Sequence, residues 1–281
     1  MSNFWARTIT GLSMVFLLLF SLWFNKFLFA GFFLVITILG LIEFYSLFIT
    51  ENYKPQRLYG VITGTLLYLS MSLISCFEWQ IDHLLWYFVP FYLAILLFFI
   101  SFIIEIYRKQ PQPMVNIAIT VVGVFYVAFP LATLNILNSS ESVHFIGFPA
   151  FLLGYFILTW FFDTGAYLYG KQFGNHKFFE RISPKKTWEG TIAGAVVTLL
   201  TALGLCFLTG EIPLTDWLVL AVIVLIFGSY GDLVESLFKR SLGIKDSGTI
   251  LPGHGGILDR FDTMLISAPF VFLYFILRNG I

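Results

Sequence analysis

Charged residues are scarce in this chain of 281 residues, which contains 11% Asp, Glu, Lys and Arg against 58% hydrophobic residues. A soluble domain carries roughly 25% charged residues. The mean hydropathy is +0.88, and the formal net charge is zero. These values exclude an ordinary soluble globular protein, a disordered chain and a nucleic-acid binder that depends on a basic surface.

Cysteine is also scarce, since only Cys76 and Cys206 occur, and both lie in apolar runs. A structural zinc site needs a cluster of ligands at short spacing, and the sequence has none. We therefore expect both cysteines to be small buried side chains. No Ser/His/Asp or Cys/His set has the pattern of a nucleophilic triad, which argues against covalent catalysis.

Long apolar runs are abundant, and many are about 20 residues long, the length that crosses a bilayer as a helix. They are continuous rather than alternating, so they predict helices and not the strands of a barrel. The sequence therefore predicts an all-α polytopic membrane protein with about nine transmembrane helices. The predicted spans are residues 9–24, 27–49, 58–77, 84–104, 114–137, 149–170, 190–209, 216–238 and 260–278. We expect the first to be retained, because no small-x-small cleavage site follows Phe24.

The basic residues divide unevenly between the two sides of this arrangement. Of the 16 Lys and Arg residues, only Lys26 and Arg278 fall on one side, and the rest fall on the other. Cytoplasmic loops carry the excess of Lys and Arg, so the N-terminus is predicted to be cytoplasmic. By chemical character the chain divides into framework helices at 1–148 and a catalytic region at 149–281, with cytoplasmic loops 171–190 and 239–259.

Two helix faces near the cytoplasmic side carry acidic residues. One face, at the end of span 216–238, carries residues that recur at helical spacing, namely Asp232, Glu235, Ser236 and Lys239. Asp259 and Asp262 share a face at the start of the last span. Ionisable groups at the margins of spans are costly unless they are paired or functional. Carboxylates of this kind are ligands that Mg²⁺ prefers, usually together with substrate phosphates.

The loop between these faces is basic and rich in glycine. Its polar residues include Lys239, Arg240, Lys245 and His254, and it ends in Gly255 and Gly256 before the last span. Glycines let backbone N–H groups approach a ligand, and the helix end favours an anion. The stretch therefore predicts a hard-metal site beside a bound phosphate. The alternatives are that Asp259 is only a helix cap and that the Lys–Arg pair only anchors the topology.

A second polar group surrounds span 149–170. Asp163 is a lone acidic residue inside this span, a functional hypothesis by default, although a hydrogen-bonded Asp that fixes helix packing is the alternative. Residues Ser183, Lys185, Lys186 and Thr187 offer two ammonium and two hydroxyl groups just before the next span, which suits a triphosphate. The pattern is not a Walker P-loop. The positive-inside rule alone would also place lysines there.

The stretch 236–262 resembles the signature of the phosphatidate cytidylyltransferases, also called CDP-diacylglycerol synthases. That signature reads S-x-x-K-R-x4-K-D and then, after a short spacer, H-G-G-x-x-D-R-x-D. Its fixed positions are all present, as Ser236, Lys239, Arg240, Lys245, Asp246, His254, Gly255, Gly256, Asp259, Arg260 and Asp262. The stretches 163–167 and 183–190 are similar to other motifs of the family, so the resemblance covers about residues 163–262.

This resemblance implies that CTP and phosphatidate give CDP-diacylglycerol and pyrophosphate, with Mg²⁺ and a monovalent cation such as K⁺ assisting. It also implies a helical membrane fold and a homodimer in the bilayer. We expect a bacterial inner (plasma) membrane location and an active site on the cytoplasmic side, where CTP is present. No nucleic-acid partner is expected.

In the mechanism that we expect, the phosphatidate phosphate attacks the α-phosphorus of CTP, so no protein nucleophile is needed. The catalytic residues would be Asp232, Asp259, Asp262, Lys239 and Arg240. The metal ligands would be Asp232, Asp259, Asp262 and, as a weaker candidate, Asp163. The substrate-binding residues would be Ser183, Lys185, Lys186, Thr187, Ser236, Lys245, His254, Gly255, Gly256 and Arg260.

Two other functions stay open at this point. A CTP-dependent lipid kinase, such as a polyprenol kinase, would transfer the γ-phosphate instead. An ion-coupled transporter would use membrane carboxylates as an ion path, but its polar groups are often distributed over repeated halves. Here the polar groups gather in one half of the chain and at one predicted membrane face.

Overall fold

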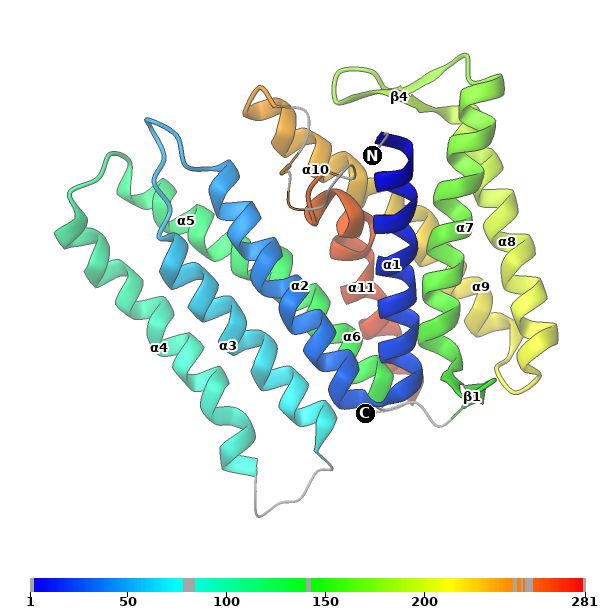
Figure 1. Ribbon diagram of the computed structural model, residues 1–281, viewed down its shortest axis with the longest axis horizontal. Helices are drawn as coiled ribbons and strands as arrows, with labels where there is room; N and C mark the ends of the chain where they lie inside the picture. The colour runs from blue at the N-terminus through cyan, green and yellow to red at the C-terminus, as the bar shows by residue number, and fades with distance from the viewer. Residues whose placement is uncertain are drawn as a thin grey trace. The chain divides into compact units, whose positions relative to one another are not determined.

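A computed structural model describes residues 3–77, 84–139, 143–244, 247–248, 250 and 255–279. The described chain is almost entirely helical, which confirms the predicted all-α class (Figure 1). Among the described residues, eight helical runs are long and apolar enough to cross a membrane. The first predicted span falls in α1 (Asn3–Phe24), whose apolar part, Thr8–Phe24, is shorter than the others. The chain is therefore an integral membrane protein with the predicted order of spans.

The chain forms two compact units, which are Met1–Ser140 with Asp246–Phe261 and Glu141–Lys245 with Asp262–Ile281. The first unit contains α1, α2 (Lys26–Leu47), α3 (Arg57–Cys76), α4 (Leu84–Arg108), α5 (Pro113–Gly123), the π-helical segment η2 (Val124–Ala128) and α6 (Phe129–Ser139). Helix α11 (Leu258–Asn279) begins in the first unit and continues into the second. The predicted division at residue 148 concerned chemical character and stays a prediction.

Glycines let the helices of the first unit pack around one buried tyrosine. The Tyr45 side chain of α2 is fully buried, and its hydroxyl donates to the Thr120 carbonyl at 2.7 Å. A Cβ atom at Gly60 or Gly123 would lie 2.3 or 2.6 Å from this ring. Small residues allow transmembrane helices to approach closely. The aromatic ring therefore takes the volume that the glycines leave between α2, α3 and α5.

The second unit contains β1 (His144–Phe145), β2 (Phe148–Pro149), α7 (Ala150–Phe173), β3 (Lys177–Phe179), β4 (Ser183–Thr187), α8 (Trp188–Thr209), α9 (Leu214–Ile223), η3 (Val224–Gly228) and α10 (Ser229–Ser241). Strands β1 and β2 form one antiparallel pair, and β3 and β4 form another. The segments α5–η2–α6 and α9–η3–α10 are each one continuous helical run with a π-helical segment near the middle. Such segments are frequently found at functional sites.

Helices α7 and α8 lie side by side and are joined by the β3–β4 hairpin (Figure 1). A Cβ atom at Gly190 would lie 2.6 Å from the Ala166 carbonyl oxygen and 2.9 Å from the Gly170 Cα atom. The two backbones are therefore in direct contact next to the hairpin. Thr187 caps α8, because its hydroxyl accepts from the Gly190 N–H at 3.2 Å. This cap fixes the position of β4, which carries the predicted phosphate-binding lysines.

Candidate functional site

Three carboxylates of the second unit gather from three helices. Asp163 comes from α7, Asp232 from α10 and Asp262 from α11. Each lies close enough to at least one of the others for a direct electrostatic interaction, and both Asp163 and Asp262 also interact with Lys186. Asp163 is exposed, and Asp232 and Asp262 are half-buried, so a ligand can reach them. We call Asp163, Asp232, Asp262 and Lys186 the acidic cluster.

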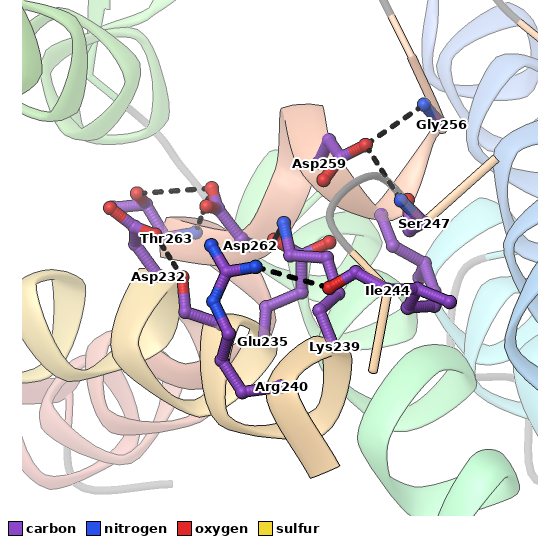
Figure 2. A network of polar contacts seen from close by, with 12 residues as sticks. Asp232, Glu235, Lys239, Arg240, Ile244, Ser247, Gly256, Asp259, Asp262 and Thr263 are labelled. Carbon is purple, nitrogen blue, oxygen red and sulfur yellow. Dashed lines mark hydrogen bonds and ion pairs between the residues drawn. The ribbon is translucent and has the colours of Figure 1, made fainter. Parts of the chain in front are cut away.

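Glycine places the second and third carboxylates next to one another. A Cβ atom at Gly231 would lie 2.4 Å from the Asp262 carbonyl oxygen and 2.9 Å from the Thr263 Cα atom. Only a residue without a side chain permits this approach of α10 to α11. Because Gly231 directly precedes Asp232, the close contact brings Asp232 to the turn that carries Asp262 (Figure 2).

Two hydroxyl groups hold the carboxylates in place. The Thr263 hydroxyl donates towards Asp163 Oδ2 at 3.5 Å and Asp262 Oδ1 at 3.4 Å, and its N–H donates to Asp262 Oδ1 at 2.7 Å. The Ser236 hydroxyl donates to Asp232 Oδ1 at 3.2 Å. Ser236 is among the predicted substrate-binding residues, whereas Thr263 is not. The position of Thr263 directly after Asp262 is the only signal that could have pointed to it.

Lys186 connects the β3–β4 hairpin to the acidic cluster. Its Nζ atom lies 2.9 Å from Asp232 Oδ2 and donates to the Ser229 carbonyl at 3.1 Å. Lys185 is exposed, Ser183 is half-buried and Thr187 is buried as the α8 cap. Of the four predicted triphosphate-binding residues, the structure therefore brings Lys186 into direct contact with the carboxylates.

The basic pair at the end of α10 is also fixed by contacts inside the second unit. Lys239 Nζ lies 3.0 Å from Glu235 Oε2, and both side chains are largely buried. Arg240 donates to the carbonyl oxygen of Ile182 at 3.4 Å. It also donates to the carbonyl oxygen of Ile244 at 3.2 Å, as Figure 2 shows. Arg240 therefore ties α10 to the turn of the hairpin, while its side chain remains exposed.

Asp259 accepts two hydrogen bonds from residues of the first unit. Its Oδ2 atom accepts from the Ser247 N–H at 3.1 Å and from the Gly256 N–H at 3.0 Å (Figure 2). Gly255 has a φ of 86°, a left-handed conformation that favours glycine. The carboxylate thus caps the turn before α11, as the alternative interpretation proposed. Metal binding by Asp259 stays a prediction.

The remaining predicted residues divide into two groups. Lys245 and His254 lie outside the described residues, so their predicted contacts with phosphate are untested. Arg260 is exposed in the first turn of α11. Gly256 is buried beside the turn that Asp259 caps.

A buried carboxylate in the first unit was missed by the sequence analysis. Glu43 of α2 is 3% exposed. It accepts from the Ser247 hydroxyl at 2.5 Å, the Ile257 N–H at 2.8 Å and the Leu258 N–H at 3.1 Å. The available signal was a lone acidic residue inside an apolar span, the same signal that identified Asp163.

The donor atoms of the acidic cluster are of the kind that suits a hard cation. Within the described ranges, no group of three or more His, Cys, Asp or Glu residues is arranged to hold a metal ion. Mg²⁺, however, is usually bound by one or two carboxylates together with waters and substrate phosphates. The three carboxylates supply such oxygens, and Lys186 supplies a counter-charge for phosphate. The residues fit Mg²⁺ in chemistry, and its binding stays a prediction, as does that of a monovalent cation.

The family described as "Cytidylyltransferase family" matches residues 5–277. A phosphatidate cytidylyltransferase of Staphylococcus aureus (strain COL) is 47% identical over 132 residues, which cover 46% of this chain and 48% of the relative. The phosphatidate cytidylyltransferase of Staphylococcus haemolyticus (strain JCSC1435) is 46% identical over 132 residues, with the same coverage.

The matched region is about half of each protein, so the chain spans about half the length of the curated relatives it matches. The family match, in contrast, extends over both compact units. It therefore includes α2 with Glu43 as well as the helices of the acidic cluster. The chain belongs to the cytidylyltransferase family.

Proposed function

We propose that this protein transfers the cytidylyl group of CTP to phosphatidate and releases pyrophosphate. The observation that carries the proposal is the acidic cluster, in which carboxylates from three helices meet a lysine of the β3–β4 hairpin. The relatives named phosphatidate cytidylyltransferase support the choice of substrates. CTP and phosphatidate both carry phosphates, which need cations and donors around them.

The reaction needs no nucleophile from the protein. An anionic oxygen of the phosphatidate phosphate forms a new bond to the α-phosphorus of CTP, and the bond from that phosphorus to pyrophosphate breaks. Catalysis then consists of aligning the two phosphates and offsetting their charge. The amines and hydroxyls around the acidic cluster are of the type that this task requires.

In the proposed site, the carboxylates of Asp163, Asp232 and Asp262 would hold Mg²⁺, one or two of them at a time together with water and phosphate oxygens. Metal binding by Asp259 stays a separate prediction. When bound, Mg²⁺ offsets phosphate charge and stabilises an in-line displacement. Thr263 and Ser236 orient the carboxylates through the hydrogen bonds described above. A carboxylate with a fixed orientation loses less entropy when it binds a cation.

Lys186 is the residue that we assign to a phosphate of CTP. Its ammonium is held by Asp232 and the Ser229 carbonyl, so it is in position before a substrate arrives. Lys239 and Arg240 lie on α10 beyond Asp232 and would contact further phosphate oxygens. Lys185, which is exposed on the same strand, would add a second ammonium from the solvent side.

We place the site at the cytoplasmic face of an inner membrane, because the excess of Lys and Arg falls on that side of the predicted topology. CTP is available there, and the head group of phosphatidate lies at the same boundary. A homodimer stays a prediction.

The test uses purified protein in detergent–lipid micelles with phosphatidate, Mg²⁺ and CTP labelled at either the α- or the γ-phosphate. We expect the α-label to enter the organic phase with an equal amount of pyrophosphate, and chelation to stop both. Transfer of the γ-label instead would identify a lipid kinase. Transfer of neither label in folded protein would contradict the proposal.

A further inference from the structure

We propose that Glu43, a residue of the N-terminal framework, is a positioning residue that fixes the first turn of α11 and the described residues of the glycine-rich loop before it (247–248, 250 and 255–257, called the loop below). The proposal rests on the proposed function, since it assigns Glu43 to that reaction. It begins from the buried Glu43 carboxylate and its three hydrogen bonds, all made within the first unit.

All three donors that bind Glu43 belong to the segment that carries the signature motif. Two of them are the N–H groups of Ile257 and Leu258, at the start of α11. The first N–H groups of a helix have no partner within the helix, and an acidic group there also interacts favourably with the helix dipole. Glu43 therefore caps α11, although it lies more than two hundred residues away in the sequence.

Two glycines of the loop leave room for this carboxylate. A Cβ atom at Gly256 would lie 1.9 Å from Glu43 Oε1, and one at Gly248 would lie 3.0 Å from Glu43 Oε2. At Gly256 any other residue would displace the carboxylate or the loop. The need for glycine at position 256 thus has a cause within the fold, in addition to the predicted approach of a phosphate.

The loop is held by two carboxylates at once. Asp259 accepts from the N–H groups of Ser247 and Gly256, and Glu43 accepts from the Ser247 hydroxyl and from the next two N–H groups along the chain. Three successive backbone N–H groups, from Gly256 to Leu258, are therefore bound to carboxylates. Asp262 lies four residues beyond Leu258 on the same helix. Because the first turn of α11 is held in place, the next turn of this helix, which carries Asp262, can move less.

Glu105 provides a matched control in the same unit. It is 4% exposed and accepts hydrogen bonds from Gln56 at 2.7 Å, Asn116 at 2.9 Å and Arg108 at 2.7 Å. None of these partners belongs to the signature motif. Glu105→Gln thus perturbs a buried carboxylate of the same type without touching the loop.

The first readout is the reactivity of the loop, which does not depend on enzymatic activity. Ile250 is 40% exposed, so Ile250→Cys, in a chain with Cys76 and Cys206 replaced by alanine, can be labelled with a water-soluble maleimide. We expect Glu43→Gln to raise the labelling rate roughly tenfold, because a buried N–H group that loses its acceptor no longer holds the loop in place. Glu105→Gln should leave the rate unchanged.

The second readout is steady-state kinetics with CTP and phosphatidate. We expect Glu43→Gln to lower kcat at saturating substrates by about tenfold or more, because small misplacements of positioned groups are costly in rate. Ser247→Ala removes only the hydroxyl group that donates to Glu43. It therefore tests the same contact if the Glu43 variant fails to fold. The double variant should lose less than the two single losses combined, because both changes break the same contact.

The outcomes separate the two proposals. If the wild type shows no transferase activity but the labelling rate rises as expected, the proposed function fails and Glu43 still fixes the loop. If Glu43→Gln and Glu105→Gln change labelling and kcat equally, or if neither changes labelling, Glu43 is an ordinary buried carboxylate and the proposal is overturned.

Discussion

At the scale of single residues, one type of side chain serves two different purposes in this protein. Asp163, Asp232 and Asp262 lie close together beside Lys186, where a ligand can reach them. The Glu43 carboxylate is instead fully engaged by donors of its own unit. Sequence position cannot distinguish Glu43 from Asp163, because each is a lone acidic residue inside a predicted span.

Asp262→Asn should reduce turnover by at least about a hundredfold in a protein that still folds, because the change removes a charge needed for cation binding. The residual activity should require a higher Mg²⁺ concentration than the wild type requires. A Mg²⁺ titration of the initial rate checks both statements. Asp216→Asn is the matched control, since Asp216 pairs with Arg278 and Tyr274 away from the cluster. An unchanged Mg²⁺ requirement would remove Asp262 from the metal site.

The substitution Asp259→Asn tests whether Asp259 is a metal ligand or only the cap of the turn before α11. A single oxygen, Oδ2, accepts both backbone N–H groups, and asparagine keeps one such acceptor. The substitution therefore preserves the cap while removing the charge. We expect folded protein without turnover, measured by thermal unfolding and by the α-label assay. Near-normal turnover would leave Asp259 as a cap only.

At the scale of elements, glycines determine which helices touch. The contact between α7 and α8 passes through Gly170 and Gly190, and that between α10 and α11 passes through Gly231. Each contact lies directly beside residues of the candidate site, namely the β3–β4 hairpin and Asp232. Close backbone contact near a site limits the movement of its side chains.

Gly190→Ala should destabilise the protein, because its Cβ atom would meet the Ala166 carbonyl and the Gly170 backbone. Overpacking of this kind costs about 1–3 kcal/mol. Gly204 of the same helix has no atom within 4 Å of an added Cβ. Gly204→Ala should therefore be neutral or slightly stabilising. Thermal unfolding in detergent compares the two variants, and an equal effect would contradict the close-contact argument.

At the scale of the whole molecule, the distribution of charge predicts the orientation in the membrane. The hairpin between α7 and α8 carries Lys177, Lys185 and Lys186, whereas the connection between α8 and α9 carries Glu211 and no basic residue. This contrast follows the positive-inside rule. Both connections belong to the second unit, so the contrast between them can be read from this unit alone.

Single cysteines test this orientation in intact cells. In a chain whose two native cysteines are replaced, Glu211→Cys should react with a membrane-impermeant maleimide, whereas Glu180→Cys should react only after the membrane is permeabilised. Both positions lie outside the long apolar stretches of their spans. The reverse pattern would place the candidate site on the outer side and would exclude cytoplasmic CTP as its substrate.

The sequence by itself determined the class of the protein and the order of its spans. Runs of about 20 apolar residues have few alternatives to a membrane helix, because unpaired backbone groups are too costly in lipid. Helical spacing likewise indicated Asp232, the polar stretch 183–190 indicated Lys186, and the signature motif indicated Asp262 before any geometry was known. These features are local in the chain, so a linear pattern can report them.

Only the tertiary structure decided which of these residues meet. It showed that Asp259 caps a turn of the first unit, whereas Asp163, Asp232 and Asp262 gather within the second unit. It also identified Glu43 and Thr263, which carry no motif of their own. Contacts between residues distant in the chain depend on how helices pack, and the glycines that permit this packing are visible in sequence without their partners.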